Sequence, residues 1–197
     1  MTKGEQTREM ILEVAAQAFN RHGFSGTSLS DIMQLTGLEK GGIYNHFESK
    51  EDLAVQAFDF AFERVSEALV SAVRQAKTAE GQLRGMINYF AEYFVSPPVP
   101  GGCPVLNTAV ESDDAYPALR NRARAAMDRW QQLVVHLVEK GKAKGEFRPS
   151  VDASALASLV LASLEGGIMM SKLYNDPIHT NTVVALLNAY VDDHVKV

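Results

Sequence analysis

Apolar residues recur along most of the chain at intervals of three, four, seven and eight positions, which is the spacing of a helix with one buried face. The stretch from Ser49 to Val73 keeps this period for too long to be a strand, and so does the stretch from Leu119 to Val138. No segment alternates strictly between apolar and polar residues, as a half-buried strand would. We therefore predict an all-α fold.

Glycine and proline clusters divide the pattern into separate helices. The breaks fall at Gly81, at 96–102, at Tyr116-Pro117, at 141–149 and at Asp176-Pro177. They predict about nine helices, near residues 5–22, 29–36, 40–46, 50–78, 80–95, 104–112, 117–143, 152–174 and 178–194. We place a domain boundary after residue 48, which gives an N-terminal three-helix domain, residues 1–48, and a larger helical domain, residues 49–197.

Two capping boxes and a glycine mark the organisation of residues 27–53. Ser28 and Asp31 have the spacing of a capping box and predict a short helix after Ser28, while Ser49 and Asp52 repeat the spacing at the start of a long one. Gly37 permits a sharp turn between two short helices, an arrangement that matches a helix-turn-helix. The first short helix is expected to bury Leu29, Ile32, Met33 and Leu35.

The same segment resembles the N-terminal DNA-binding region of the TetR family of bacterial transcriptional regulators. The most specific part is Gly41-Gly42-Ile43-Tyr44-Asn45-His46-Phe47 followed by Ser49-Lys50-Glu51-Asp52-Leu53. The likeness extends back through residues 7–12, Ala18-Phe19 and Gly23-Phe24. Beyond about residue 60 it is mainly one of size and helical pattern. The resemblance implies an N-terminal helix-turn-helix domain followed by a helical domain for ligand binding and dimerisation.

Candidate DNA contacts follow from helix chemistry and from the resemblance. Thr27 and Ser28 lie at a helix N-terminus, where unpaired N–H groups and a partial positive charge favour phosphate. The Tyr44 hydroxyl is suited to donate to a phosphate oxygen, and Asn45 to pair with adenine. The resemblance implies phosphate contacts for Thr27, Lys40, Tyr44 and Lys50, and positions at or near the bases for Gly41, Gly42, Asn45 and His46. The alternative is a small helical packing unit without a DNA role.

Charge limits the kind of DNA binding that is possible. The formal net charge is -5, and residues 1–50 carry five Lys or Arg against six Asp or Glu. Non-specific coating of nucleic acid depends on many phosphate contacts and does not fit this balance. A site-specific dimer needs only local positive charge, which Lys40 and Lys50 supply.

The larger domain contains more aromatic and methionine side chains than a three-helix domain requires, and some of them are expected to line an effector cavity. Simple core packing is the alternative. Cys103 precedes Pro104 at the predicted start of a helix, where a thiolate is favoured, so it is a candidate sensor of oxidants or electrophiles, with a plain packed cysteine as the alternative. The effector candidates are Phe58, Phe62, Met86, Tyr89, Phe90, Tyr93, Asn107, Trp130, Val134 and Met169.

Two C-terminal helices have broad apolar faces that one domain covers only in part. In the resembled family, such helices pair with their counterparts in a four-helix dimer interface, and a two-fold dimer suits a palindromic DNA site. Burial within one chain is the alternative. The candidate interface residues are Leu156, Leu159, Val160, Leu164, Val183, Leu187 and Tyr190.

These observations together predict a homodimeric, ligand-responsive transcriptional repressor. It binds a palindromic operator in double-stranded DNA and is released by a small hydrophobic effector of unknown identity, with modification of Cys103 as the alternative trigger. We find no HExxH, GxSxG or P-loop motif and no clustered metal ligands, so we expect neither an enzyme nor a bound metal or cofactor. One cysteine, a polar N-terminus and an apolar stretch of only about ten residues, 155–164, favour a cytoplasmic protein without a membrane span.

Overall fold

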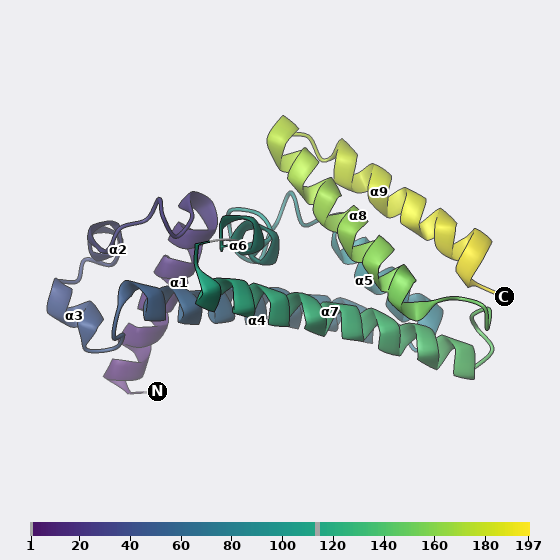
Figure 1. Cartoon of the computed structure of the whole chain (residues 1–197), viewed down its shortest axis with the longest axis horizontal. Coiled ribbons are helices and arrows are strands. Elements are labelled where there is room, and N and C mark those ends of the chain that lie inside the picture. Colours follow the sequence, from purple (N-terminus) through teal and green to yellow (C-terminus); the bar gives the residue numbers. More distant parts are fainter. Residues whose placement is uncertain (1, 113–114) are drawn as a thin grey trace. The chain divides into compact units, whose positions relative to one another are not determined.

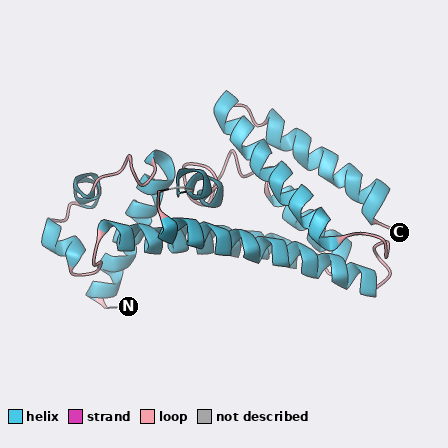
Figure 2. Ribbon diagram, viewed as in Figure 1, coloured by secondary structure: helices cyan, strands magenta, loops and turns pink. Residues whose placement is uncertain are grey.

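A computed structural model describes residues 2–112 and 115–197 and contains nine α-helices and no strand over these ranges, which confirms the all-α prediction (Figures 1 and 2). A short π-helical turn, Val191–Val195, follows the last α-helix. The helices are α1 (Lys3–His22), α2 (Leu29–Thr36), α3 (Lys40–Tyr44), α4 (Lys50–Arg74), α5 (Ala79–Tyr89), α6 (Pro104–Ser112), α7 (Pro117–Ala143), α8 (Ala153–Tyr174) and α9 (Ile178–Tyr190).

Several helices end earlier than their apolar pattern predicts. The expected helix 80–95 ends at Tyr89, because the residues after it form hydrogen-bonded turns that lead into Pro97-Pro98. The expected break at Gly81 is wrong, because Gly81 lies in the first turn of α5. Thr78 is the N-terminal cap of this helix, and its hydroxyl accepts the Gly81 N–H at 3.0 Å. A hydrophobic period therefore continues through short turns and does not by itself reveal where a helix stops.

Internal contacts divide the chain into two compact units. The first consists of Met1–Val65 and Val99–Ala125, and the second of Ser66–Pro98 and Ala126–Val197. Helices α4 and α7 each contribute residues to both units, and α6 belongs to the same unit as the three N-terminal helices. The domain boundary expected after residue 48 stays a prediction, because compactness alone does not identify an independently folding segment.

The core of the first unit is built by the N-terminal helices and the start of α4. Ile11 and Ala15 of α1, Ile32 of α2 and Leu53 of α4 are all buried there. In α2 the predicted face is correct for Ile32, but Leu35 is 61% exposed. Only one side of this eight-residue helix faces the core, so apolar side chains on its other side stay exposed.

The second unit contains the antiparallel hairpin of α8 and α9, which lie side by side in Figure 1. The backbones approach closely at Gly167, where a Cβ atom would stand 3.3 Å from the Thr180 Cα atom. One turn further along, the buried Ser171 hydroxyl accepts the Thr180 N–H and pairs with the Thr180 hydroxyl, both at 2.9 Å. Small and polar residues therefore set the spacing of this apolar hairpin.

Helix α8 runs through Glu165 and Gly166-Gly167, where the sequence interpretation ended its apolar stretch. At 22 residues it is long and apolar enough, by length and composition, to cross a membrane. This is weak evidence, since half of its most apolar window is buried within the protein and core helices pass the same criterion. The expectation of no membrane span stays a prediction.

The contact between Ser171 and Thr180 predicts a stability effect. In Ser171→Ala the buried Thr180 N–H and hydroxyl lose their shared partner, which costs about 1–3 kcal/mol. Urea unfolding at fixed protein concentration measures this loss. Ser71→Ala is the control, because Ser71 is exposed on α4 in the same unit and its change is expected to stay within about 0.5 kcal/mol. Equal midpoints for the two variants would show that the buried hydroxyl contributes nothing.

Candidate nucleic-acid interface

Helix α2 begins at the predicted capping box. The Ser28 hydroxyl accepts the Asp31 N–H at 3.1 Å, and the Asp31 carboxylate accepts the Ser28 N–H at 2.7 Å. Gly37 ends the helix with a φ of 69°, a conformation that glycine adopts without the steric cost of a Cβ atom. The chain then turns through Leu38 and Glu39 into α3, so the local geometry of a helix-turn-helix follows directly from these residues.

Helix α3 has only five residues, of which two are glycines, and is too short to be stable alone. Ile43 and Phe47 hold it in place, because both side chains are buried in the core of the first unit. The helix ends at Tyr44, two residues earlier than expected, and Asn45 forms its C-terminal cap through its N–H to Gly41. Anchoring one side of α3 leaves the opposite side in solvent.

The exposed side of α3 carries Lys40, Gly41, Tyr44 and Asn45, which we call the reading face. The Lys40 ammonium lies 5.5 Å from the centre of the Tyr44 ring, so a cation and a phenol are presented together. A Cβ atom at Gly41 would meet no atom within 4 Å. The fold therefore does not require glycine at this position, and the smooth surface there is available to a ligand.

Gly42 has different surroundings from Gly41. A Cβ atom at Gly42 would lie 3.3 Å from the Leu38 Cβ, so the residue faces the turn, and its small size serves packing inside the protein. His46 is half-buried beside the Phe47 ring. Of the four positions expected to face the bases, Gly41 and Asn45 are exposed on α3, whereas Gly42 and His46 are directed in part toward the protein.

Two of the side chains expected to contact phosphate make hydrogen bonds within the protein. The Thr27 side chain is buried, and its hydroxyl donates to the Gly23 carbonyl at 2.8 Å, so it fixes the α1–α2 loop. The Lys50 ammonium donates to the Phe24 carbonyl at 2.6 Å and lies 4.2 Å from the centre of the Phe24 ring. Ser28 is exposed, but its hydroxyl is already engaged in the capping box.

The effector candidates are divided between the two units. Phe58, Phe62 and Asn107 belong to the first unit and the others to the second. In the second unit the Phe90 ring packs edge-to-face on Trp130 at 6.3 Å and stacks on Tyr93 at 5.6 Å, an arrangement typical of a filled aromatic core.

Two effector candidates have positions that differ from a cavity lining. Met169 is 51% exposed on α8. The Asn107 amide donates to the Asn20 carbonyl at 3.1 Å and to the Asn20 side chain at 2.9 Å, so it is committed to holding α1 against α6.

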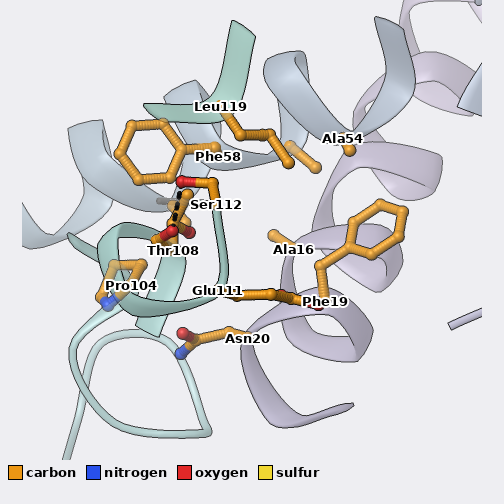
Figure 3. Close-up of a pocket in the computed structure, with 12 residues that line it drawn as sticks. Ala16, Phe19, Asn20, Ala54, Phe58, Pro104, Thr108, Glu111, Ser112 and Leu119 are labelled. Atoms are coloured by element: carbon orange, nitrogen blue, oxygen red, sulfur yellow. Dashed lines mark hydrogen bonds between the residues drawn. The ribbon is translucent and has the colours of Figure 1, made fainter. Parts of the chain in front are cut away.

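Figure 3 shows a cavity in the first unit, lined by residues of α1, α4, α6 and α7 that include Phe58, Phe19 and Leu119. Its free volume is about 30 Å³. One water molecule occupies about this volume in the liquid, whereas drug-sized ligands need several hundred Å³. An organic effector would therefore need an opening of the helices to enter here. The identity of the effector site stays a prediction.

Cys103 is buried and immediately precedes α6, where its carbonyl accepts the Asn107 N–H. Burial keeps its sulfur from solvent in this conformation, so a reaction with an oxidant or electrophile requires local opening of the loop. Its position before Pro104 is the one expected from the sequence.

The predicted dimer residues fall into two groups. Leu159 and Tyr190 are each 40% exposed, whereas Leu156, Val160, Leu164 and Leu187 are buried within the chain and Val183 is half-buried beside Gly167. Helical periodicity identified apolar faces but could not say which apolar residues the protein itself covers. The exposed apolar side chains on the two helices are Leu159, Met169, Met170, Leu173, Tyr174, Ile178, Leu186 and Tyr190.

Sequence reasoning missed the buried polar residue Asn20, whose amide donates to the carbonyls of Pro100 at 3.0 Å and Gly102 at 2.9 Å. These bonds join the end of α1 to the glycine-rich loop before α6. The available signal was an asparagine on the apolar side of α1, followed much later by a loop rich in proline and glycine. Neither feature alone specifies the pairing.

The short helix α2, its left-handed glycine turn and the anchored α3 with its exposed face define a helix-turn-helix DNA-binding protein. Comparisons with known proteins agree. The family described as "Bacterial regulatory proteins, tetR family" matches residues 11–57, and "Tetracyclin repressor-like, C-terminal domain" matches residues 79–187. The chain belongs to the TetR family of transcriptional regulators.

Relatives match along almost the whole length. A TetR transcriptional regulator from Chloroflexus aurantiacus J-10-FL is 44% identical, with all of both chains covered and a TM-score of 0.97. A TetR-family regulator from Cytophaga hutchinsonii is 33% identical, covering 100% of this chain and 98% of that one, with a TM-score of 0.91. The HTH-type transcriptional repressor DhaR of Mycobacterium sp. (strain GP1) is 28% identical over 84% of this chain and 82% of that protein.

The capping box of α2 predicts a pH dependence. Hydrogen bonds from the Ser28 hydroxyl and N–H hold the pKa of Asp31 below its ordinary value of 3.8. A lowered pKa means that the carboxylate contributes stability above the unfolded-state value, and that this contribution is lost as the pH falls through the folded-state value. The difference in unfolding free energy between the native protein and Asp31→Asn should therefore shrink between about pH 5 and pH 3. A constant difference in denaturant titrations across this range would contradict the assignment.

Proposed function

We propose that this protein is a homodimeric repressor that binds a palindromic operator through the reading face and releases it when a small molecule binds the C-terminal part of the chain. The observation that carries the proposal is the exposed reading face on an anchored α3. The tetR family match at residues 11–57 supports DNA as the partner. Lys40 and the Tyr44 hydroxyl are suited to phosphate, and the Asn45 amide is suited to an adenine edge.

A dimer is needed because a single α3 presents too few side chains to specify a site. Two copies related by a two-fold axis read two half-sites about one turn of DNA apart, or a multiple of it. The large exposed apolar side chains of α8 and α9 support these helices as the dimer surface, since exposed apolar patches mark interfaces. The C-terminal match over residues 79–187 includes both helices.

The release step is proposed to act through α4. This helix begins three residues after Phe47, at Lys50. Its first turn is capped by the Ser49 hydroxyl, which accepts the Asp52 N–H at 3.0 Å, and Leu53 is buried in the same core as Ile43. A ligand that shifts α4 therefore shifts the anchoring of α3. A coupling of about 1–3 kcal/mol changes operator affinity about 5- to 150-fold. Operator affinity that ignores every ligand bound by the protein would remove this step.

Modification of Cys103 is the alternative trigger, and it requires the buried thiol to become exposed first. The tetR family match supports a regulatory protein and not an enzyme. Operator binding implies a cytoplasmic protein in a bacterium.

The dimer proposal predicts that Leu173→Asp separates the subunits. Leu173 is 73% exposed, so the charge costs the single chain little, but in an apolar interface it would be buried without a partner. Sedimentation velocity should show a monomer, and circular dichroism should show native helix content. Val95→Asp is the control, because Val95 is an equally exposed valine outside α8 and α9. A Leu173→Asp protein that stays dimeric at micromolar concentration would place the interface elsewhere.

The DNA proposal predicts opposite effects of Gly41→Ala on stability and on binding. The added methyl group meets no protein atom and raises helix propensity, so the protein should be unchanged or up to about 1 kcal/mol more stable. Against a groove floor the same methyl should weaken operator binding by about tenfold, equivalent to about 1.4 kcal/mol. The assay is a titration of DNA from upstream of the protein's own gene.

Gly4→Ala is the matched control, because Gly4 is a helical glycine of α1 with only the Thr2 hydroxyl near its absent Cβ. It should leave operator affinity unchanged. If Gly41→Ala also binds with native affinity, the reading face does not approach DNA closely. If the native protein binds no upstream fragment at low salt, the proposed function itself fails.

A further inference from the structure

The loop between α1 and α2 is held by a carboxylate from a distant part of the first unit. Glu111, near the end of α6, accepts the Phe24 N–H through Oε2 and the Ser25 N–H through Oε1, both at 2.8 Å. Two successive amides that bind one carboxylate form a charge-assisted and geometrically specific contact. The residues lie 87 and 86 positions apart in sequence, so no local turn accounts for it.

Gly23 leaves space for this contact. A Cβ atom there would lie 2.7 and 2.8 Å from the two oxygens of Glu111, closer than side chains approach one another. Gly23 also has a φ of 77°, which orients the following amides toward α6. The glycine that ends α1 therefore does two things: it turns the chain, and it admits the carboxylate.

Side chains of Lys50 and Tyr116 also contact Phe24 and Ser25. The Lys50 ammonium donates a hydrogen bond to the Phe24 carbonyl at 2.6 Å. The Tyr116 ring meets the Phe24 ring edge-to-face at 4.6 Å, and the hydroxyls of Tyr116 and Ser25 are 2.9 Å apart. Phe24-Ser25 stands only two residues before Thr27 and Ser28, which start α2. Its position therefore fixes where the helix-turn-helix begins.

Glu111 also lines the small cavity of the first unit. Figure 3 shows its side chain extending from α6 toward α1, beside Phe19 and Asn20, along the wall of the small cavity. The contact is thus a discrete attachment, made by one side chain, between α6 and the start of the helix-turn-helix.

We propose that Glu111 is a positioning residue for operator binding: its carboxylate, clamped on the Phe24 and Ser25 amides, holds the helix-turn-helix in the orientation that fits DNA. The inference rests on the proposed function. Glu111 touches no DNA in this account and acts through the α1–α2 loop. Its negative charge alone would oppose DNA binding, so a simple electrostatic role predicts tighter binding once the charge is removed.

The test compares Glu111→Gln with Glu13→Gln. Both variants lose one negative charge in the first unit, but Glu13 is exposed on α1. Glutamine at position 111 keeps the shape of the side chain, offers one acceptor, and turns an amide donor toward the second N–H. We expect Glu111→Gln to bind the operator at least about fivefold more weakly than the native protein, and Glu13→Gln to bind equally well or more tightly.

Four further measurements separate positioning from stability. The thermal midpoint of Glu111→Gln should stay close to native and above the assay temperature. The fraction of dimer at the assay temperature should also stay close to native. The salt dependence of operator affinity should be unchanged, because no phosphate contact is lost. Amide hydrogen exchange should increase at Phe24 and Ser25 and not at Ile11 in the core.

The outcomes are distinct. Native affinity in Glu111→Gln overturns the proposal, and so does a loss that disappears once the concentration of folded protein is corrected for. If Glu111→Gln does not fold, Glu111→Asp replaces it: the charge remains, but the shorter side chain cannot reach both amides, and a weaker operator complex from folded protein supports the proposal whereas native affinity overturns it. Failure of the native protein to bind DNA would refute the proposed function instead.

Discussion

The burial of Ile43 and Phe47 is the interaction on which the rest of the structure depends. A five-residue helix with two glycines has no intrinsic stability, so α3 exists only because these two side chains enter a core built by α1, α2 and the start of α4. That anchoring points Lys40, Tyr44 and Asn45 outward and keeps them on one rigid surface. The buried residues therefore determine which side chains are exposed for recognition.

Much of the fold was readable from the sequence because its signals are local. The capping box at Ser28 and Asp31 and the turn at Gly37 depend on residues a few positions apart, and the bounds of α2, α6 and α7 agree with the prediction. Residues whose role depends on distant neighbours were not predictable. The position of the Lys50 ammonium, for example, is set by the Phe24 carbonyl, 26 positions earlier in the chain.

The same distinction explains the remaining differences at the site. Gly41 and Gly42 are equivalent in sequence, yet one faces solvent and the other faces Leu38. Periodicity marked both Leu159 and Leu156 as apolar positions of α8, but only packing against α9 and other parts of the second unit decides which of them stays exposed. The aromatic pattern left cavity lining and core packing open, and only the structure shows that Phe90, Tyr93 and Trp130 pack on one another.

Polar contacts complement this apolar core. Asn20 and Asn107 join α1 to the loop before α6, and Glu111 and Lys50 hold Phe24 from two directions. Hydrogen bonds of this kind need defined geometry, whereas apolar packing tolerates small shifts. The first unit thus combines an apolar core that maintains α3 with a set of directional contacts that orients the α1–α2 loop.

The most direct test of this account is methylation protection with dimethyl sulfate on a bound upstream DNA fragment. The reagent attacks guanine N7 in the major groove and adenine N3 in the minor groove. Insertion of α3 from both subunits predicts protected guanine N7 atoms in two symmetric patches, centred about 10 base pairs apart or a multiple of that distance. Unprotected guanines beneath the bound protein, or protection confined to adenine N3, would contradict it.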